Sequence, residues 1–397
     1  MTTPFGSFAP TRFPEDPRDR LRAWDAADEY LLRHLAEGTG ERPPVPLEGR
    51  RIVVLGDRWG ALTTALAGYG PTQLTESYLT RRATEANLLR AGAEPGSVTL
   101  LTTPDETPPA GVDALLVRVP KSLALLEDLL ARVAPRLAPD AVVVGTGMVK
   151  EIHTSTLEVF ERLLGPTRTS LAERKARLIF TVPAGPAADP ARAERVAAAA
   201  AARPVRRRLD RDAGPGSGLT AVGHAGVFCA DRLDIGTRFL LKHLPTGVPA
   251  GSAVADLGCG NGIVGTAAAK ANPGVSVLFA DESYPAVASA RLTWAENGGE
   301  GFGSARFLVG DGLAEVAAGS LDLVLNNPPF HSHQATTDAT AARMFAQARR
   351  ALRPGGELWV VGNRHLGYHV RLRRMFGNCE LVASDPKFVV LRAVRRG

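Results

Sequence analysis

The pattern that most constrains this fold is a regular alternation of short apolar segments and helical segments in the second half of the chain. Apolar runs typical of buried strands lie at residues 253–257, 276–280, 306–309, 321–325, 357–361 and 388–394. Segments with helical periodicity separate most of them, at 263–271, 286–297, 340–352 and 369–376. Strands separated by helices of this length indicate a parallel, doubly wound sheet. We therefore predict an α/β domain in this half.

The first half of the chain repeats this order of strands and helices, but the residues that would carry the chemistry are missing. Its matching features are a strand at 51–55 that runs into Gly56 and Gly60, residues 73–76 where a second strand would end in an acid, a strand at 113–119 followed by Pro120 and Lys121, and a strand at 141–144. Trp59 crowds the place where a nucleotide would approach the loop. We therefore predict a duplicated chain of two tandem Rossmann-like domains, of which the N-terminal one is degenerate.

A change of composition marks the boundary between these domains. At 397 residues the chain exceeds the usual size of a single core, so two domains are expected. The boundary region contains an alanine run at 197–202, an arginine triplet at 206–208 and a Gly/Ser-rich stretch at 214–218. We interpret the run as a short helix, the triplet as a solvated helix face and the stretch as a hinge or loop.

A glycine-rich loop follows the strand at 253–257 and opens a helix. Asp256 precedes three glycines at alternate positions, Gly258, Gly260 and Gly262. Glycines let the backbone turn tightly and let a ligand lie against it without contacting a Cβ atom. Such a loop serves NAD, FAD or S-adenosylmethionine. The acid ahead of the first glycine favours S-adenosylmethionine, because it can face the amino-acid end of that cofactor.

Two further acids follow the next two predicted strands. Asp281 lies about 20 residues after the loop, where an acid can accept hydrogen bonds from both ribose hydroxyls. It could also cap the following helix. Asp311 stands where it can accept from the adenine amino group, although an Asp before Gly312 is also an ordinary turn residue. We expect both acids to contact the cofactor.

The predicted strand at 321–325 runs into the turn Asn327-Pro328-Pro329-Phe330. Two prolines fix φ and remove backbone donors, so the Asn327 side chain and the Pro328 carbonyl can accept both hydrogens of an NH2 group. Phe330 offers a flat face to a ring. Accepting both hydrogens helps a conjugated nitrogen to pyramidalise, which is catalysis by positioning and electrostatic preorganisation. A proline-rich turn with an exposed aromatic residue is the plainer interpretation.

Charge and cysteine content limit the class of protein. The net charge of +6 and the pI of about 9.5 suit a polyanionic partner without requiring one. Cys229, Cys259 and Cys379 form no Cys-x-x-Cys pair, and His331 and His333 lack Cys or acidic companions, so we expect neither disulfides nor a metal. No stretch approaches the roughly 20 apolar residues of a membrane span. We expect a soluble, cytoplasmic protein.

The loop at 256–262 together with the turn at 327–330 resembles a class I S-adenosylmethionine-dependent methyltransferase of the amino-methylating type. The segment from Gly226 to Thr237 resembles the one that precedes the cofactor loop in the bacterial ribosomal RNA guanine-N2 methyltransferases, the RlmG and RsmC family. Further stretches resemble the branch of this family that acts on the large-subunit (23S) RNA; they lie at 120–127, 153–156, 175–180, 363–366 and 387–391. The resemblance covers most of the chain from about Arg50 onward.

This resemblance implies methylation of the N2 amine of one guanine in 23S ribosomal RNA, with S-adenosylmethionine as the cofactor. The turn at 327–330 would hold the flipped guanine, and four residues would help to enclose the cofactor, namely Phe228, Asp234, Gly236 and Thr237. Four basic residues agree with an RNA substrate, although a solvated helix face would also account for them: Arg364, Arg371, Arg373 and Arg374.

The expected organisation is two class I methyltransferase domains in tandem. Residues 1–190 form the degenerate domain, with an RNA-binding or structural role, 191–220 form a linker, and 221–397 form the catalytic domain. We expect a monomer without membrane association. Three alternatives remain open: a 16S guanine-N2 methyltransferase, an enzyme that uses the same turn on a protein glutamine, and a non-enzymatic RNA-binding assembly factor that keeps the fold as a scaffold.

Overall fold

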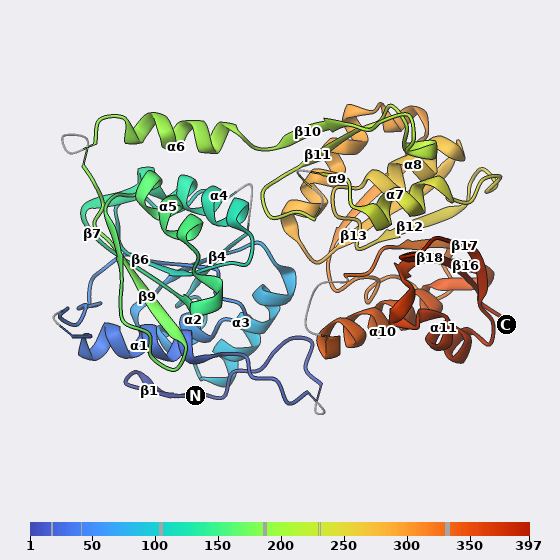
Figure 1. Ribbon diagram of the computed structural model, residues 1–397. Helices are drawn as coiled ribbons and strands as arrows, with labels where there is room; N and C mark the ends of the chain where they lie inside the picture. Colours follow the sequence, from blue (N-terminus) through green and yellow to red (C-terminus); the bar gives the residue numbers. More distant parts are fainter. Residues whose placement is uncertain are drawn as a thin grey trace. The chain divides into compact units, whose positions relative to one another are not determined.

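The computed structural model describes residues 1–16, 19–40, 42–102, 106–185, 189–228, 230, 232–329 and 334–397. Phe330, His331 and His333 therefore lie outside the described residues. The chain divides into two compact units, Met1–Arg203 and Pro204–Gly397, and each contains one seven-stranded sheet between helices (Figure 1). Among the described residues, no helix combines the length and the apolar character needed to cross a bilayer.

The sheet of the C-terminal unit has the strand order β14-β13-β12-β15-β16-β18-β17. Its strands are β12 (Ala253–Leu257), β13 (Val275–Asp281), β14 (Gly303–Val309), β15 (Leu321–Asn326), β16 (Leu352–Asn363), β17 (Glu380–Ser384) and β18 (Phe388–Val394). The first five in the order are parallel, whereas β18 runs antiparallel to both of its neighbours. The chain order reverses between β12 and β15, which is where ligands bind at the carboxyl ends of such sheets.

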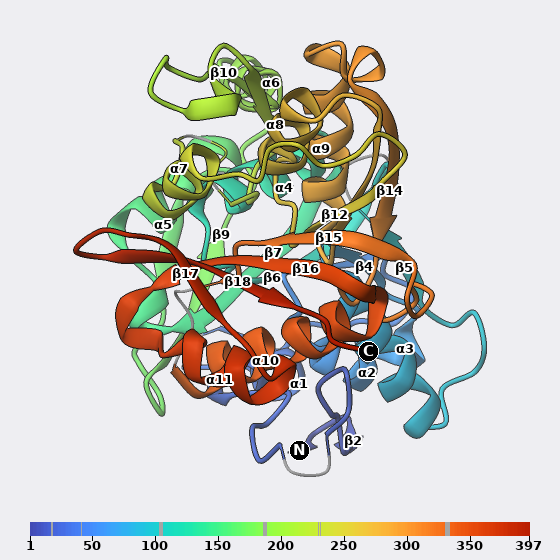
Figure 2. The same cartoon turned by 90° about the vertical axis from the view of Figure 1, so that its right-hand side faces the viewer.

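Helices cover both faces of this sheet (Figure 2). One face carries α7 (Ile235–Lys242), α8 (Ile263–Ala271) and α9 (Tyr284–Glu296), and the other carries α10 (Gln334–Ala351) and α11 (Tyr368–Phe376). The middle strand β15 has three consecutive apolar residues, 323–325, because both of its faces are buried. Leu323 and Leu325 pack on the α7–α9 side, and Val324 packs on the α10–α11 side. A strand buried on both faces has no polar alternation.

The N-terminal unit has the equivalent order, β5-β4-β3-β6-β7-β9-β8. Its strands are β3 (Ile52–Leu55), β4 (Thr72–Thr75), β5 (Thr99–Thr102), β6 (Val112–Arg118), β7 (Leu137–Met148), β8 (Thr167–Thr169) and β9 (Ala176–Thr181). Its helices are α1 (Ala26–Glu37), α2 (Ala61–Ala65), α3 (Tyr78–Arg90), α4 (Leu123–Val133), α5 (Thr154–Leu163) and α6 (Arg192–Ala201); a small hairpin, β1 (Thr2–Thr3) and β2 (Gly6–Ser7), precedes them. The predicted pair of tandem Rossmann-like domains is confirmed.

One local prediction at the boundary was wrong. The arginine triplet does not lie on a helix but in the strand β10 (Val205–Arg208), which pairs antiparallel with β11 (Thr220–Gly223). The backbone amide of Val222 donates to the Thr293 hydroxyl of α9 at 2.9 Å, which anchors this hairpin. Pairing with β11 therefore holds the triplet in an extended conformation, with its side chains exposed.

Candidate active site

The glycine loop after β12 has the backbone that a ligand cradle requires. Gly258, Gly260 and Gly262 have φ of +71°, +51° and +74°. A Cβ atom at Gly262 would lie 2.6 Å from that of Ala290 in α9, so this glycine is needed for packing. At Gly260 the nearest atom would be the Phe228 carbonyl oxygen at 3.7 Å. Among the described residues nothing else crowds this face of Gly260, so a ligand can lie directly on its backbone.

Asp256 lies within β12 and is almost fully buried. Its Oδ2 accepts from the backbone amide of Gly265 in the first turn of α8, at 2.8 Å. Burial raises the pKa of Asp256 to about 8, although the Gly265 amide opposes this rise, and the neighbouring charge of Asp281 adds to it. A cationic amino group close to Asp256 would favour its ionised form.

Asp281 is the last residue of β13 and connects that strand to the loop. Its Oδ2 accepts from the amide of Gly260 and its Oδ1 from the amide of Ser283, both at 2.9 Å. Burial raises its pKa, and these amide bonds oppose the rise. The alternative that Asp281 caps α9 is wrong, because the N-cap is Ser283, whose hydroxyl accepts from Ala286. The Asp281 carboxylate is instead bound to the open glycine of the loop.

Asp311 lies in the turn after β14 and already has a cationic partner. Its Oδ1 is 3.2 Å from Nη2 of Arg343 in α10, and its backbone carbonyl accepts from Gln347 at 3.0 Å. These contacts hold the turn against α10. That the Asp311 carboxylate accepts from the adenine amino group stays a prediction.

Asn327 follows the end of β15, and its side-chain amide contacts α7. Nδ2 donates to Oγ1 of Thr237 in α7 at 2.8 Å. Oδ1 is buried and has no hydrogen-bond partner among the described residues. Of the two prolines that follow, Pro328 is buried and Pro329 is exposed. Within the part of the chain that the structure describes, Asn327 Oδ1 is therefore an acceptor without a partner at the carboxyl edge of the sheet.

The segment before α7 contributes further predicted residues. Asp234 is the N-cap of α7, and its Oδ2 accepts from the Thr237 amide at 3.0 Å. Gly236 is buried in the first turn of this helix. The Phe228 side chain is 49% exposed, while its backbone lies near Gly260. The structure thus brings the loop, Asp281, Phe228 and the Asn327–Thr237 pair to one end of the sheet.

Sequence reasoning missed one residue that connects the loop and the turn. Asn326 is fully buried, and its Nδ2 donates to the Leu257 carbonyl oxygen at 2.7 Å, which joins the ends of β15 and β12. The doubled asparagine in the sequence was a usable signal, since a second amide at the end of a buried strand needs a partner.

The N-terminal unit has different chemistry at the equivalent place. The strand pair β3–β6 of the N-terminal unit has the same register as the pair β12–β15 of the C-terminal unit. Val117 lies opposite Leu55, and Asn326 lies opposite Leu257. Arg118 therefore occupies the position of Asn327. By the same count along the loop, Arg58 occupies the position of Gly260.

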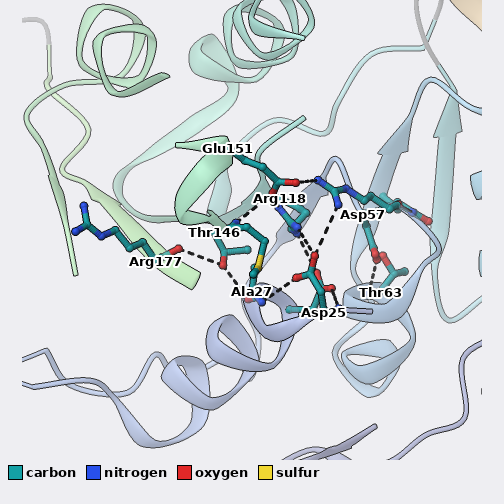
Figure 3. A network of polar contacts seen from close by, with 12 residues as sticks. Asp25, Ala27, Asp57, Thr63, Arg118, Thr146, Glu151 and Arg177 are labelled. Atoms are coloured by element: carbon teal, nitrogen blue, oxygen red, sulfur yellow. Dashed lines mark hydrogen bonds and ion pairs between the residues drawn. The ribbon is translucent and has the colours of Figure 1, made fainter. Parts of the chain in front are cut away.

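These two arginines belong to a cluster of ion pairs, and Figure 3 shows Arg118 within it, close to Asp25 and Glu151. The Arg118 side chain is 1% exposed; its Nη2 lies 2.8 Å from Asp25, its Nη1 lies 3.0 Å from Glu151, and its Nε lies 3.4 Å from Asp28. Arg58 also pairs with Glu151, at 2.8 Å. Protein side chains fill the place that the loop and turn leave open in the other unit, which explains why this unit is degenerate.

The pKa values of two acids in this cluster are shifted in opposite directions. Burial raises the pKa of Asp28 to about 7, and Arg118 opposes this rise. Burial also acts to raise the pKa of Glu151, but Arg118 and Arg58 outweigh it and lower the pKa to about 2. Burial alone would lower the pKa of Arg118, whereas the surrounding carboxylates raise it. Arg118 is therefore cationic throughout the physiological range.

The fold, the glycine loop and the asparagine turn define a class I S-adenosylmethionine-dependent methyltransferase. Two family models match the chain: RLMG N-terminal domain at residues 1–185 and Methyltransferase small domain at residues 218–392. Proteins named ribosomal RNA large subunit methyltransferase G from Streptomyces avermitilis and Streptomyces coelicolor are each 66% identical; both cover 100% of this chain, which spans 99% and 100% of theirs. The chain belongs to the ribosomal RNA large subunit methyltransferase G family.

More distant relatives extend this similarity. The protein of the same name from Ectopseudomonas mendocina is 48% identical over 99% of both chains. A solved structure with a similar fold is the T. Thermophilus 16S rRNA N2 G1207 methyltransferase in complex with AdoMet and guanosine. Its TM-score is 0.70 at 22% identity, and the match covers 94% of this chain and 92% of that one. The two-domain fold is thus shared along nearly the whole length.

The open face of Gly260 predicts a selective loss of cofactor binding. In a Gly260→Ala variant the new methyl group would enter the space beside the loop, so we expect the Kd for S-adenosylmethionine to rise by about tenfold or more, equivalent to about 1.4 kcal/mol. Gly298→Ala is the matched control, because Gly298 also has a positive φ (+62°) and its Cβ would meet nothing within 4 Å. Calorimetry would measure both. Equal Kd values for the two variants would contradict the assignment.

Proposed function

We propose that this chain transfers a methyl group from S-adenosylmethionine to the exocyclic N2 amine of one guanine in 23S ribosomal RNA. The observation that carries the proposal is the Asn327 amide. Its Oδ1 is a buried acceptor without a partner among the described residues, and its Nδ2 is held by Thr237. A buried acceptor of this kind is satisfied when a substrate N–H donates to it.

The chemistry follows from what an aromatic amine needs. When bound, S-adenosylmethionine supplies an electrophilic methyl group on a sulfonium. The guanine N2 lone pair is conjugated with the ring and must be turned toward that methyl group. Asn327 Oδ1 accepts one amine hydrogen and the Pro328 carbonyl accepts the other, which aids pyramidalisation. No strong base is needed before attack, because the nitrogen becomes acidic only once methylated.

The cofactor would be held by residues already gathered at the loop. Asp281 would accept from the ribose hydroxyls beside the open face of Gly260, and Asp256 would face the amino-acid end. Phe228 and the first turn of α7 would enclose it, and Asp311 would accept from the adenine amino group. In this assignment Phe330 stacks on the flipped guanine.

Exposed basic residues support an RNA substrate. Arg364 and His365 lie in the short turn after β16, and Arg373 and Arg374 lie on α11. Because β16 is parallel to β15, the end of β16 shares the sheet edge with Asn327. Cations at this edge can neutralise phosphates around a base swung out of its stack. Residues 221–397 would thus be catalytic, and 1–190, followed by the linker at 191–220, would bind RNA or serve a structural role.

The proposed reaction takes place on ribosomal RNA in the cytoplasm, with the chain acting as a monomer. Its test is a transfer assay with labelled S-adenosylmethionine and unmodified 23S or 16S RNA. We expect label in 23S RNA alone, at guanine N2. Label in 16S RNA alone would show that 16S RNA, and not 23S RNA, is the substrate. Cofactor binding with no label in RNA, either free or in subunit particles, would contradict the proposal and favour an assembly factor.

A further inference from the structure

The contact between Thr237 and Asn327 joins two positions far apart in the sequence. Thr237 is 5% exposed and stands at the third position of α7. Its backbone amide is held by the N-cap Asp234 at 3.0 Å, so its place is fixed by the start of the helix. Its hydroxyl oxygen accepts from Asn327 Nδ2 at 2.8 Å.

An asparagine side chain has a donor end and an acceptor end of almost the same shape. Rotating the amide by half a turn exchanges the two ends. If the ends of Asn327 were exchanged, an NH2 group would face the substrate amine, and two donors would oppose each other. A hydroxyl can accept or donate, so the bond to Thr237 fixes where the amide lies, and the donor amine of the substrate then selects the Oδ1 end. In the structure Nδ2 lies toward Thr237, and Oδ1 is buried without a partner among the described residues.

The N-terminal unit supplies an independent observation on the same pair of positions. Asp25 is the N-cap of α1, and the third residue of that helix is Asp28. Arg118, at the position of Asn327, has its Nε 3.4 Å from Asp28 Oδ1. In both units the third residue of the helix contacts the equivalent position in the sheet: Asp28 of α1 contacts Arg118 at the end of β6, and Thr237 of α7 contacts Asn327 after β15. The two partners are chemically matched each time: hydroxyl with amide, carboxylate with guanidinium.

We propose that Thr237 is a positioning residue for methyl transfer, which holds the Asn327 side chain in the place where its Oδ1 accepts from the substrate amine. This inference rests on the proposed function, since it assumes that an amine is the acceptor. It assigns to Thr237 an action through Asn327 that is separate from enclosure of the cofactor. Loss of the hydroxyl would remove the anchor of the amide, so that Oδ1 would lie at the accepting position for a smaller part of the time.

The test compares Thr237→Val, which removes the hydroxyl and keeps the shape, with Thr237→Ser, which keeps the hydroxyl. The measurement is the single-turnover rate at saturating cofactor and RNA. We expect Thr237→Val to lower this rate by about 10- to 100-fold, as for one lost oriented hydrogen bond, and Thr237→Ser to stay within about threefold of the unaltered protein. The Kd for S-adenosylmethionine is measured for both variants, because the first turn of α7 would also enclose the cofactor, and saturation removes any change in that Kd from the measured rate.

Thr293→Val is the matched control, because it removes another buried hydroxyl from the same unit. We expect it to leave the single-turnover rate unchanged. If the unaltered protein methylates no RNA, the proposed function itself fails. If it is active and Thr237→Val is equally fast, or if Thr237→Val loses rate only through weaker cofactor binding that saturation restores, the positioning role is wrong.

Discussion

Replacing Asn327 by Ala is expected to abolish methyl transfer while S-adenosylmethionine still binds nearly as tightly as before. The variant removes the free Oδ1 acceptor, so the substrate amine loses the partner that turns its lone pair toward the methyl group. Loss of one preorganised polar group of this kind lowers the rate of catalysis by about 100- to 1,000-fold, and we expect at least that. The loop and Asp281 bind each other through Gly260, without Asn327.

Single-turnover transfer to RNA and calorimetry with the cofactor would measure these two effects. Asn378→Ala serves as the control, because Asn378 makes two hydrogen bonds to backbone carbonyls at the end of α11 and of β18, away from the loop. We expect this control to retain the rate even if it unfolds at a lower temperature. An Asn327→Ala protein with normal turnover would show that the amide is not the amine acceptor.

Replacing Arg118 by Met is expected to destabilise the N-terminal unit by about 3–5 kcal/mol. The substitution leaves Asp25, Asp28 and Glu151 together without the buried guanidinium that neutralises them. Their mutual repulsion and their burial are then compensated only in part, by Arg58, which still pairs with Glu151 at 2.8 Å and with Asp25 at 3.7 Å. Urea unfolding would measure the free energy of unfolding, and hydrogen exchange in β6 and β7 would locate the change, since local opening follows local stability.

The loss of stability in the Arg118→Met variant should depend on pH, because the remaining acids of the cluster titrate. In the variant Arg58 still pairs with Glu151, but Asp28 loses the cation that opposes its burial, so the folded-state pKa of Asp28 lies further above its unfolded value and the folded state takes up a proton there. The variant therefore regains stability as pH falls from about 8 to about 5. The intact protein instead has Glu151 with a pKa of about 2, and that contribution to stability is present above the ordinary pKa of 4.5.

Two variants sharpen this experiment. Arg162→Met removes an exposed pair with Glu127 at 2.9 Å and should cost less than about 1 kcal/mol. Arg118→Met combined with Asp28→Asn should recover part of the lost stability, because one buried charge is removed with its partner. An Arg118→Met protein as stable as Arg162→Met at pH 8 would contradict the structural role of the cluster.

Elements with strong apolar patterns were predictable from the sequence. The strands at 253–257 and 388–394 and the helix at 263–271 have the predicted bounds, because glycines and polar residues delimit short apolar runs there. The helix α7 was not predicted, although its N-cap Asp234 is a recognisable start signal. The edge strand β17 was also missed, since its residues are half exposed and pair on one side only.

The candidate site was predictable only where one segment carries the chemistry. The glycine loop and the asparagine turn are local patterns, so their residues could be named in advance. The Thr237–Asn327 bond and the Arg118 cluster join residues from separate elements, and a single sequence does not show which of them meet. Arg118 in particular follows an apolar strand like an ordinary surface cation. Only the strand register identifies it as the counterpart of Asn327.

The central claim is methylation of guanine N2 in 23S RNA, and nucleoside mass spectrometry tests it most directly. Ribosomal RNA would be taken from cells with the gene for this chain, without it, and complemented with either the unaltered protein or Asn327→Ala. We predict that 23S RNA alone loses N2-methylguanosine without the gene, and that only the unaltered protein restores it. Unchanged N2-methylguanosine in 23S RNA, or loss from 16S RNA instead, would contradict the account.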